Sequence, residues 1–501
     1  MAMAINKRSK ASAGVQVHFL LAAVLISAVP VFAADQLVEL TKPTNQFSQA
    51  EEFEAFQGGE VTSIAPLDDK AFSHFSANMP RHLEMNFHLG NALFRKLWVA
   101  SPSSTQASDG LGPLYNARSC ESCHLRDGRG NADGIGKDNV ALFLRLARPA
   151  LTPEEKQAVA AHMALNFPDP VYGHQLQPLA VPGLAGEGQM AVSYSEEKVI
   201  LAGGETVSLR KPTYSVANPG YGALDPATTL SPRLTPAMIG LGLVDAIPAG
   251  DILANADPDD KNQDGIRGRA ALVRNHSGEI VLGRFGWKAQ NPDTRSQTAD
   301  AFSGDIGIST EEKPSPYGDC TQSQKDCLAA PTGVQKRLGP YEASRDIVDL
   351  VTFYAQHLAV PARRKAGFPE VLAGKKLFYE AGCTSCHVPK FMTQNIPDDP
   401  ARSNQLIWPY SDFLLHDMGD GLADGQQVGV ATGNDWRTPP LWGIGLAATV
   451  NGSPAYLHDG RARTLTEAIV WHGGEAEKSR NAFVNMTEDQ RKSLIRFLES
   501  M

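Results

Sequence analysis

The chain has 501 residues, a length that allows two to four domains. With 42% hydrophobic and 20% charged residues, its composition is that of an ordinary globular protein, which excludes a disordered or collagen-like chain. The net charge of −9 makes nucleic acids and anionic membrane surfaces poor partners.

Residues 1–33 predict an export signal. The basic residues Lys7, Arg8 and Lys10 precede an apolar run over 17–31, and Ala33 ends a small-residue cleavage pattern. A transmembrane anchor is the alternative, but the run is shorter than the roughly 20 residues that a span needs. We therefore expect a cleaved periplasmic protein that is not stably inserted in a membrane. Loss of the three basic residues would change the net charge from −9 to −12.

Two copies of a Cys-x-x-Cys-His motif, at 120–124 and 383–387, carry the strongest signal in the sequence. This is the attachment pattern of c-type haem, in which two thiols bind the haem and the histidine becomes the proximal iron ligand. A zinc site would need a second such pair at short spacing, and a redox-active dithiol would not need the histidine. We predict two covalently bound haem c groups. The residues that would hold them are Cys120, Cys123, His124, Cys383, Cys386 and His387.

Other landmarks recur in the same order around the two motifs. The matching stretches are 90–94 with 374–378, 235–243 with 438–446, and 283–299 with 460–468. Such repetition is typical of an internal duplication. We predict an N-terminal haem domain with insertions at 34–343 and a C-terminal domain at 344–501.

The first domain contains a predicted hairpin over 192–206 and a predicted calcium loop over 257–266. The loop has oxygen-bearing side chains at alternate positions before Gly265, as calcium loops do, but Ala271 stands where the closing Glu is expected. A turn rich in Asp and Asn is the alternative. The candidate calcium ligands are Asp257, Asp260, Asn262 and Asp264.

The rest of the chain favours helices and loops. Cys320 and Cys327 are expected to form a local disulfide. Helical periodicity predicts helices over 347–358 and 465–471, and the capping pair Thr487 and Gln490 predicts a C-terminal helix. The 45 glycines and 33 prolines favour long loops. We expect a mainly α, loop-rich fold of two cytochrome c-like domains, with a minor β insertion in the first.

The sixth iron ligands decide what each haem does, because only an iron with an open position can bind peroxide or oxygen. In the second half, His472 follows a short helix, and His416, Met418 and His458 are also candidates. The matching stretch of the first half contains neither His nor Met. We expect a closed electron-transfer haem between His387 and His472 and an open haem above His124. The alternative makes His472 a surface residue and gives the first haem a ligand from His174, His82 or Met85.

Long stretches of the chain resemble the di-haem oxidoreductases related to bacterial di-haem cytochrome c peroxidase, and in particular their putative-peroxidase branch. The resemblance covers 109–120, 283–288, 410–419, 436–442 and 457–475. It implies two facing cytochrome c-like domains, an N-terminal peroxidatic haem, a C-terminal electron-transfer haem and Ca²⁺ at the domain boundary. Some relatives are called thiol oxidoreductases, but the cysteines of this chain do not support that activity.

The resemblance also assigns roles to single residues. It places the distal ligand of the second haem at His472, where the peroxidases have Met, and Met418 is the second choice. The catalytic carboxylate falls near Asp305, an Asp in place of the family's Glu, with Asp245 as a second candidate. Such a carboxylate would move a proton between the two oxygens of peroxide. A solvent-facing turn is the alternative for Asp305.

The sequence thus predicts an exported di-haem c-type oxidoreductase that acts on peroxide or an oxygen species. Its electron donor is expected to be a small cytochrome c or cupredoxin with a basic docking face. The alternatives are an oxidase of an organic or protein substrate and a non-catalytic electron-transfer or redox-sensing cytochrome. Arg437 and Arg461 are candidates to pair with haem propionates, or they form ordinary ion pairs.

Overall fold

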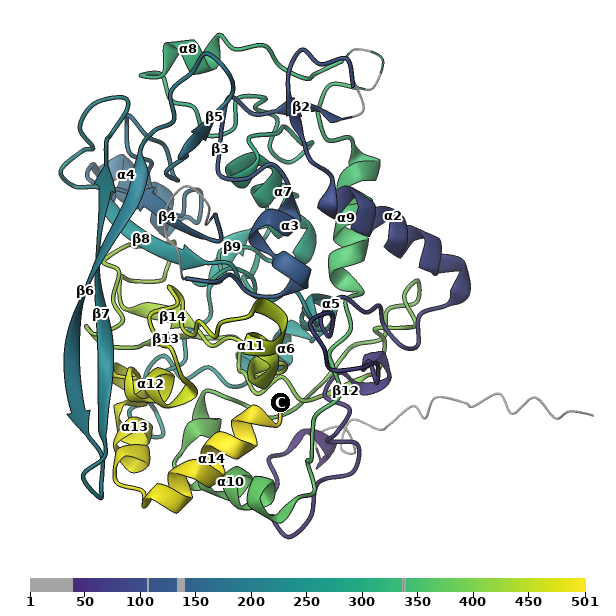
Figure 1. Cartoon of the computed structure of the whole chain (residues 1–501), viewed down its shortest axis with the longest axis vertical. Coiled ribbons are helices and arrows are strands. Elements are labelled where there is room, and N and C mark those ends of the chain that lie inside the picture. The colour runs from purple at the N-terminus through teal and green to yellow at the C-terminus, as the bar shows by residue number, and fades with distance from the viewer. Residues whose placement is uncertain (1–38, 106–107, 133–139, 336, 338) are drawn as a thin grey trace, which may run out of the picture. The chain divides into compact units, whose positions relative to one another are not determined.

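Two pairs of crossing helices lie next to the two Cys-x-x-Cys-His motifs in this computed structural model (Figure 1). Helix α2 (Glu84–Arg95) packs on α9 (Arg345–Gln356), and α10 (Pro369–Glu380) packs on α14 (Glu488–Glu499). A Cβ atom added at Gly90 would lie 2.7 Å from Tyr354 Cβ, and one added at Gly374 would lie 2.8 Å from Phe497 Cβ. Both repeated glycines therefore let two helices approach closely, which is why they occupy matching places in the two halves.

The structure describes residues 39–105, 108–132, 140–335, 337 and 339–501, so the predicted export signal lies outside the described residues. Residues 41–501 form one compact unit. Among the helices of the described residues, none combines the length and the apolar character that crossing a membrane requires. Helix α9 lies after the predicted boundary at 343/344 but packs on α2 of the first half. The boundary itself remains a prediction.

The prediction of a mainly α, cytochrome c-like fold is wrong. The structure is 28% helical and 17% strand, and its described residues form seven two-stranded sheets, so the fold is mixed. All pairs are antiparallel except β1–β2. The pairs are β1 (Val99–Ala100) with β2 (Asp109–Leu111), β3 (Leu114–Tyr115) with β5 (Leu179–Ala180), β4 (Leu142–Ala147) with β8 (Thr229–Leu234), β6 (Gln189–Ile200) with β7 (Thr206–Ala217), β9 (Leu272–Arg274) with β10 (Ile280–Leu282), β11 (Phe391–Met392) with β12 (Leu406–Ile407), and β13 (Leu415–Asp417) with β14 (Asp435–Arg437).

Most of these strands are too short for sequence patterns to reveal. A strand of two or three residues cannot show the alternation of apolar and polar side chains that identifies a half-buried strand. Strand β8 is longer, but it contains Pro232, a residue that argues against a central strand. These strands pair because distant segments meet in the folded chain, and the sequence pattern does not encode that meeting.

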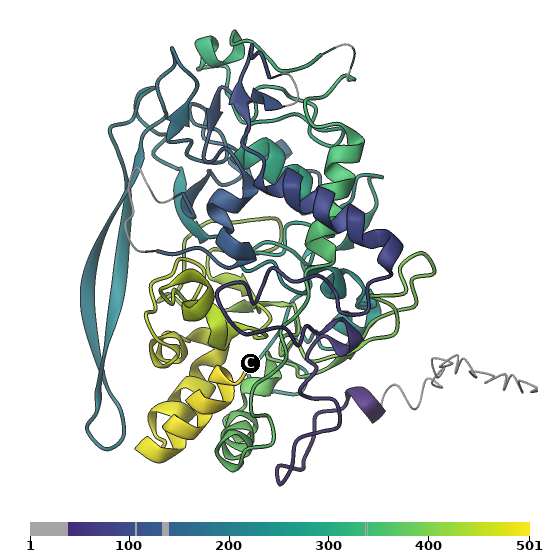
Figure 2. The same cartoon turned by 45° about the vertical axis from the view of Figure 1, so that its right-hand side comes forward.

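The predicted hairpin is confirmed and is longer than expected. Strands β6 and β7 have 12 residues each, and they pair in register from Gln189 with Ala217 to Ile200 with Thr206. The hairpin runs along the C-terminal half in both views (Figures 1 and 2). The buried Val207 and Leu209 join the apolar cluster of that half.

The predicted helices at 347–358, 465–471 and the C-terminus are also confirmed, as α9, α12 (Leu465–Val470) and α14, and the Thr487 capping box is present. Cys320 and Cys327 are disulfide-bonded, as expected. The other α-helices are α3 (Cys120–Cys123), α4 (Pro153–Ala160), α5 (Leu241–Asp245), α6 (Ala249–Leu253), α7 (Thr294–Asp305), α8 (Lys325–Leu328), α11 (Ala447–Asn451) and α13 (Glu477–Val484). The short 3₁₀ helices are η1 (Gly59–Val61), η2 (Arg81–Leu83), η4 (Leu125–Asp127), η5 (Cys383–Ser385), η6 (Ile444–Leu446) and η7 (Gly474–Ala476).

The two halves share one hydrophobic core. Ile239 and Val244 of the first half pack in the same buried cluster as Phe413 and Trp442 of the second. The repeated Gly240 and Gly443 each begin a short helix, with φ of 72° and 71°, a left-handed conformation that favours glycine. The duplicated landmarks therefore lie where the two halves meet.

Candidate functional site

The first haem motif ends in a histidine whose ring is held by a backbone carbonyl. Helix α3 begins at the cap Ser119, and His124 follows it with Nδ1 3.0 Å from the carbonyl oxygen of Pro236. Because a carbonyl only accepts, Nδ1 carries the hydrogen and Nε2 keeps its lone pair, which is the form that binds a metal. Burial lowers the pKa of His124 to about 4, so the ring is neutral at neutral pH.

The second motif repeats this arrangement and adds a second histidine. Nδ1 of His387 lies 2.8 Å from the carbonyl oxygen of Tyr410, and Nδ1 of His472 lies 2.7 Å from that of Ala468. Burial lowers the pKa of His387 to about 4, and the charge of His472 contributes to that shift. Burial also lowers the pKa of His472, so both rings are neutral with Nε2 available as a ligand.

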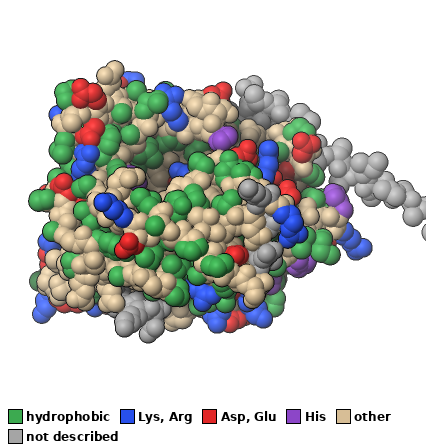
Figure 3. All heavy atoms as spheres, turned by 90° about the horizontal axis from the view of Figure 1, so that it is seen from above, with side chains coloured by type: hydrophobic (Ala, Val, Ile, Leu, Met, Phe, Trp, Pro, Cys, Tyr) green, Lys and Arg blue, Asp and Glu red, His purple; other side chains and the backbone are tan. Residues whose placement is uncertain are grey.

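A cavity of about 600 Å³ opens beside His124. Cys120, Cys123 and His124 line it, and so do Arg437 and Trp442 of the second half. The molecular face in Figure 3 is hollowed, with hydrophobic and basic side chains around the hollow. Burial lowers the pKa of His124, hydrogen bonds to backbone carbonyls partly oppose that shift, and no histidine is among its causes. The surroundings of the two proximal histidines thus differ, as the sequence predicts.

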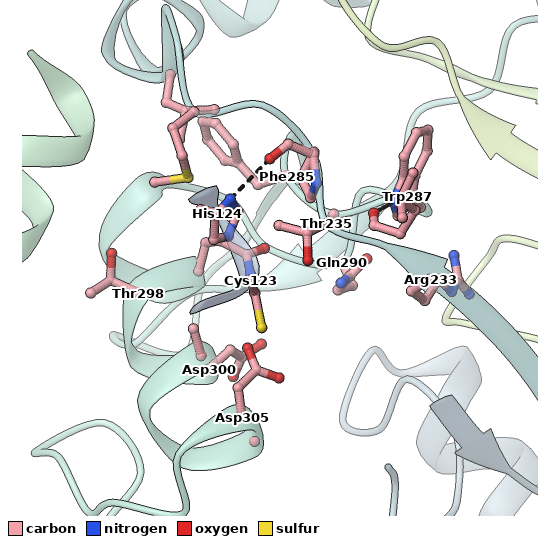
Figure 4. A pocket seen from close by; sticks show the side chains of 18 of the residues that line it. Cys123, His124, Arg233, Thr235, Phe285, Trp287, Gln290, Thr298, Asp300 and Asp305 are labelled. Atoms are coloured by element: carbon pink, nitrogen blue, oxygen red, sulfur yellow. Dashed lines mark hydrogen bonds between the residues drawn. The ribbon is translucent and has the colours of Figure 1, made fainter. Parts of the chain in front are cut away.

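Asp305 is the last residue of α7 and lines this cavity. Its carboxylate accepts a hydrogen bond of 2.8 Å from Gln175 Nε2, and burial raises its pKa. Its charge raises the pKa of both Cys120 and Cys123, so it lies near the two thiols. Figure 4 shows Asp305 on the same side of the cavity as Cys123. The alternative of a solvent-facing turn does not fit this position.

Asp245 lies elsewhere. It lines a separate pocket of about 420 Å³ and accepts hydrogen bonds from the Thr294 N–H at 3.1 Å and from Gln356 Nε2 at 2.9 Å. Burial raises its pKa. Asp245 therefore holds the start of α7, and among the described residues it is not part of the wall around His124.

The alternative iron ligands are distributed unevenly. His174 lines the cavity of His124, whereas His82 and Met85 lie at the start of α2, and Met85 is 64% exposed. In the second half both ring nitrogens of His416 are in use, with Nδ1 2.6 Å from Glu475 and Nε2 2.8 Å from Asp412.

Two further candidates of the second half pack against other groups. The ring of His458 stacks on Trp436 with the ring centres 3.7 Å apart. Met418 packs against the apolar cluster that contains Trp471. Among these candidates, His472 is the one whose neutral ring is oriented by a backbone carbonyl alone.

The predicted calcium loop is closed by its own hydrogen bonds. Asp260 accepts from the Gly265 N–H at 3.1 Å, Asp264 from the Ile266 N–H at 2.8 Å, and Asp257 from the Asn262 N–H at 3.2 Å. The part of the chain that the structure describes contains no group of three or more His, Cys, Asp or Glu arranged to hold a metal ion. These hydrogen bonds form an Asp- and Asn-rich turn, and calcium binding there stays a prediction.

Sequence reasoning missed three residues of the cavity wall: Gln175, Arg145 and Arg129. Gln175 reaches Asp305 from a segment 130 positions earlier in the chain. No local pattern marks such a residue. Arg129 follows the first haem motif directly, and its position was the one available signal.

Comparison with family models matches residues 52–501 to "Di-haem oxidoreductase, putative peroxidase". The chain belongs to this family of di-haem oxidoreductases. No curated protein matches it. The match confirms the resemblance seen in the motifs and makes the chain an oxidoreductase with haem cofactors.

The residues around the two motifs fit haem. Cys120, Cys123, Cys383 and Cys386 are all free of disulfide bonds. Burial raises the pKa of Cys120 and of Cys383 to about 12, which keeps both thiols uncharged. Three neutral histidines present Nε2 as the free ring nitrogen, two at one motif and one beside the cavity. This donor set suits a di-haem oxidoreductase.

Proposed function

We propose that this di-haem oxidoreductase is an exported peroxidase-like enzyme with two c-type haems. Electrons enter at the haem of His387 and are used at the haem of His124 to reduce peroxide or a related oxygen species. One contrast supports this division most: the neutral ring of His472 is oriented by the Ala468 carbonyl and its charge acts on His387, whereas His124 lines a cavity of about 600 Å³.

The thiols of each motif would anchor one haem, and His124, His387 and His472 would be the axial ligands. Haem bound there would supply the redox chemistry. Reduction of hydrogen peroxide consumes two electrons and two protons and yields two waters, so protons must reach the cavity. Asp305 lies in the cavity wall with Gln175 donating to it, and its raised pKa favours a carboxyl group that can carry a proton.

The compartment and the partner are part of the same proposal. The export signal of residues 1–33 supports a periplasmic enzyme, since c-type haem and the disulfide between Cys320 and Cys327 both suit an oxidising compartment. The acidic chain favours a small cytochrome c or cupredoxin with a basic face as electron donor. Calcium at 257–266 remains a prediction of the sequence pattern alone.

Low-temperature electron paramagnetic resonance of the haem-loaded protein tests the division of roles. We expect one low-spin and one high-spin haem in the wild type. His472→Ala should convert the low-spin signal to high-spin, because it removes one of the two strong ligands. His174→Ala is the matched control and should change neither signal.

Two low-spin haems in the wild type would contradict the proposal, since neither iron would then have an open position. The chain would in that case be an electron-transfer cytochrome. If His174→Ala converts a low-spin signal, His174 is a ligand of the first haem, and that haem has no open position either.

A further inference from the structure

Two arginines of the cavity wall have no carboxylate partner. The cations that line the cavity are Arg129, Arg145, Arg233, Arg284, Lys313 and Arg437. Arg233 pairs with Asp424 at 3.2 Å, and Lys313 pairs with Asp300 at 2.7 Å. The other four cations of the wall, Arg145, Arg284, Arg129 and Arg437, differ in the acidic groups near them.

Arg145 and Arg284 also have acidic neighbours. Arg145 lowers the pKa of Asp305 by its charge, and the charge of Asp245 acts on Arg284. Arg129 and Arg437 form no ion pair among the described residues. They are therefore two cations of this wall that have no carboxylate of the described residues within ion-pair distance.

The contacts of Arg129 are to neutral groups. Its Nη2 donates to the carbonyl oxygen of Leu457 at 2.9 Å, and its guanidinium lies over the Trp287 ring at 5.8 Å. Its Nε is buried and has no hydrogen-bond partner. Burial lowers its pKa to about 10, and the titratable group that acts on it is the phenol of Tyr456. A guanidinium with a buried, free N–H is a strong indication of a missing acceptor.

Arg437, on the other half of the molecule, also donates to backbone carbonyls. Its Nε donates to the carbonyl oxygen of Gly286 at 2.9 Å, and its Nη1 donates to that of Thr438 at 3.1 Å. Burial lowers its pKa to about 10, and the carboxylate that acts on it, Asp412, is already bonded to His416. Arg437 is only 9% exposed.

The two arginines converge on Trp287. Arg129 lies over the Trp287 ring, and the backbone N–H of Arg437 donates to the Trp287 carbonyl at 2.9 Å. Trp287 is itself part of the cavity wall, on the side away from Asp305 in Figure 4. The cavity thus presents two unpaired cations on one side, one from each half of the chain. The group that complements them carries two carboxylates and fits beside His124.

We infer that Arg129 and Arg437 bind the two propionate carboxylates of the haem on His124, so that this haem joins the two halves of the protein. The inference rests on the proposed function, since it requires haem at the first motif. Arginine is suited to this task because its planar fork binds a carboxylate through two hydrogen bonds. Arg461, the other sequence candidate, already pairs with Asp459 at 2.8 Å.

The test measures the midpoint potential of each haem in the loaded protein by spectroelectrochemical titration. Arg129→Gln and Arg437→Gln each remove a positive charge beside the propionates, which favours the ferric over the ferrous state. We expect the midpoint potential of the first haem to fall by about 59 mV. For a one-electron couple this corresponds to a tenfold change in the equilibrium constant of reduction. The potential of the second haem should not change.

Arg126→Gln is the matched control. Arg126 lies three residues from Arg129 and pairs with Asp69 at the surface at 3.2 Å, so its removal changes the net charge equally. Equal potentials of the first haem in Arg126→Gln, Arg129→Gln and Arg437→Gln would overturn the inference. An unchanged potential combined with weaker inhibition by acetate or phosphate would assign the pair to an anionic substrate and would overturn it as well.

If the Gln variants do not load haem, variants that keep the positive charge can be tested instead. Arg129→Lys and Arg437→Lys should load it, retain most of the potential, and shift the propionate bending bands in resonance Raman spectra, because Lys cannot form the bidentate contact. Propionate bands identical to those of the wild type would overturn the inference. Failure of the proposed function would appear differently, as two low-spin signals, and would leave the potential of the His124 haem measurable.

Discussion

The three candidate ligand histidines of this protein are held in the same way. In His124, His387 and His472 the Nδ1–H group donates to a backbone carbonyl, so the ring is oriented and its tautomer is fixed. Burial keeps His124 and His387 neutral by lowering the pKa of each to about 4. His416 shows the contrast, because two carboxylates hold its two nitrogens and its pKa lies well above the usual range. His416 therefore differs from these three candidate ligands in its hydrogen-bond partners.

Asp305→Asn tests the proton-carrying role at the residue scale. We expect peroxide turnover to fall by roughly 10²-fold or more, since an amide cannot exchange a proton, while haem content stays the same. Steady-state reduction of peroxide by a reduced donor protein measures this. Asp300→Asn is the matched control, because Asp300 lies on the same helix and in the same cavity wall but pairs with Lys313. An equal loss in both variants would argue against a specific role for Asp305.

At the scale of elements, the two halves differ most in the helix that follows their third shared landmark. Helix α7 begins after the cap Asp293, has 12 residues and ends at Asp305. Helix α12 begins after the cap Thr464 and has 6 residues, and His472 follows it within one turn. The same place in the duplicated fold thus presents a carboxylate in one half and an imidazole in the other. This difference separates the cavity at His124 from the paired histidines at His387.

The helix crossings make a prediction about the repeated glycines. Gly90→Ala and Gly374→Ala should each destabilise the protein by about 1–3 kcal/mol, because the added methyl group meets the facing helix of each pair. Gly250→Ala is the control, since a methyl group added at Gly250 in α6 would have nothing within 4 Å. Alanine there should leave stability unchanged or raise it by up to about 1 kcal/mol.

Equilibrium urea denaturation of the three glycine variants gives the comparison. Equal stabilities of Gly90→Ala and Gly250→Ala would show that α2 and α9 can separate without cost, and that the repeated glycine has another purpose.

At the scale of the whole molecule, segments of the first half complete the second. Hairpin β6–β7 lies in the first half of the sequence, but its Arg210 donates to the carbonyl oxygens of Gly460 at 3.1 Å and Arg461 at 3.3 Å. The hydroxyl of Tyr214 donates to Asp459 at 3.1 Å. In return, Arg437 and Trp442 of the second half line the cavity of the first haem motif. The surroundings of each haem motif are therefore built from residues of both halves.

Arg210→Met should destabilise the protein by about 1–3 kcal/mol, because two carbonyls of the second half lose their donor. Lys211→Met is the matched control. Lys211 is the next residue of the same strand, faces the other way, and pairs only with Glu197 at the surface, so its loss should stay within about 0.5 kcal/mol. Urea denaturation of both variants distinguishes them, and equal effects would show that the hairpin contributes no specific contact.

The sequence by itself determined the chemistry that depends on short spacing. The two Cys-x-x-Cys-His motifs, the cap at Thr487, the disulfide of Cys320 and Cys327, and the hairpin are all local, because the residues that act together lie within a few positions of one another. The duplication was also visible, since it repeats landmarks in a fixed order. Family membership follows from the same motifs.

Only the tertiary structure decided the fold class and the surroundings of each histidine. Strands β3 with β5 and β4 with β8 pair residues that are far apart in the chain, and such pairs leave no period in the sequence. Gln175 meets Asp305, Pro236 meets His124, and Arg129 meets Trp287 for the same reason. Long-range packing alone brings these groups together, and it depends on the shapes of whole surfaces rather than on any local pattern.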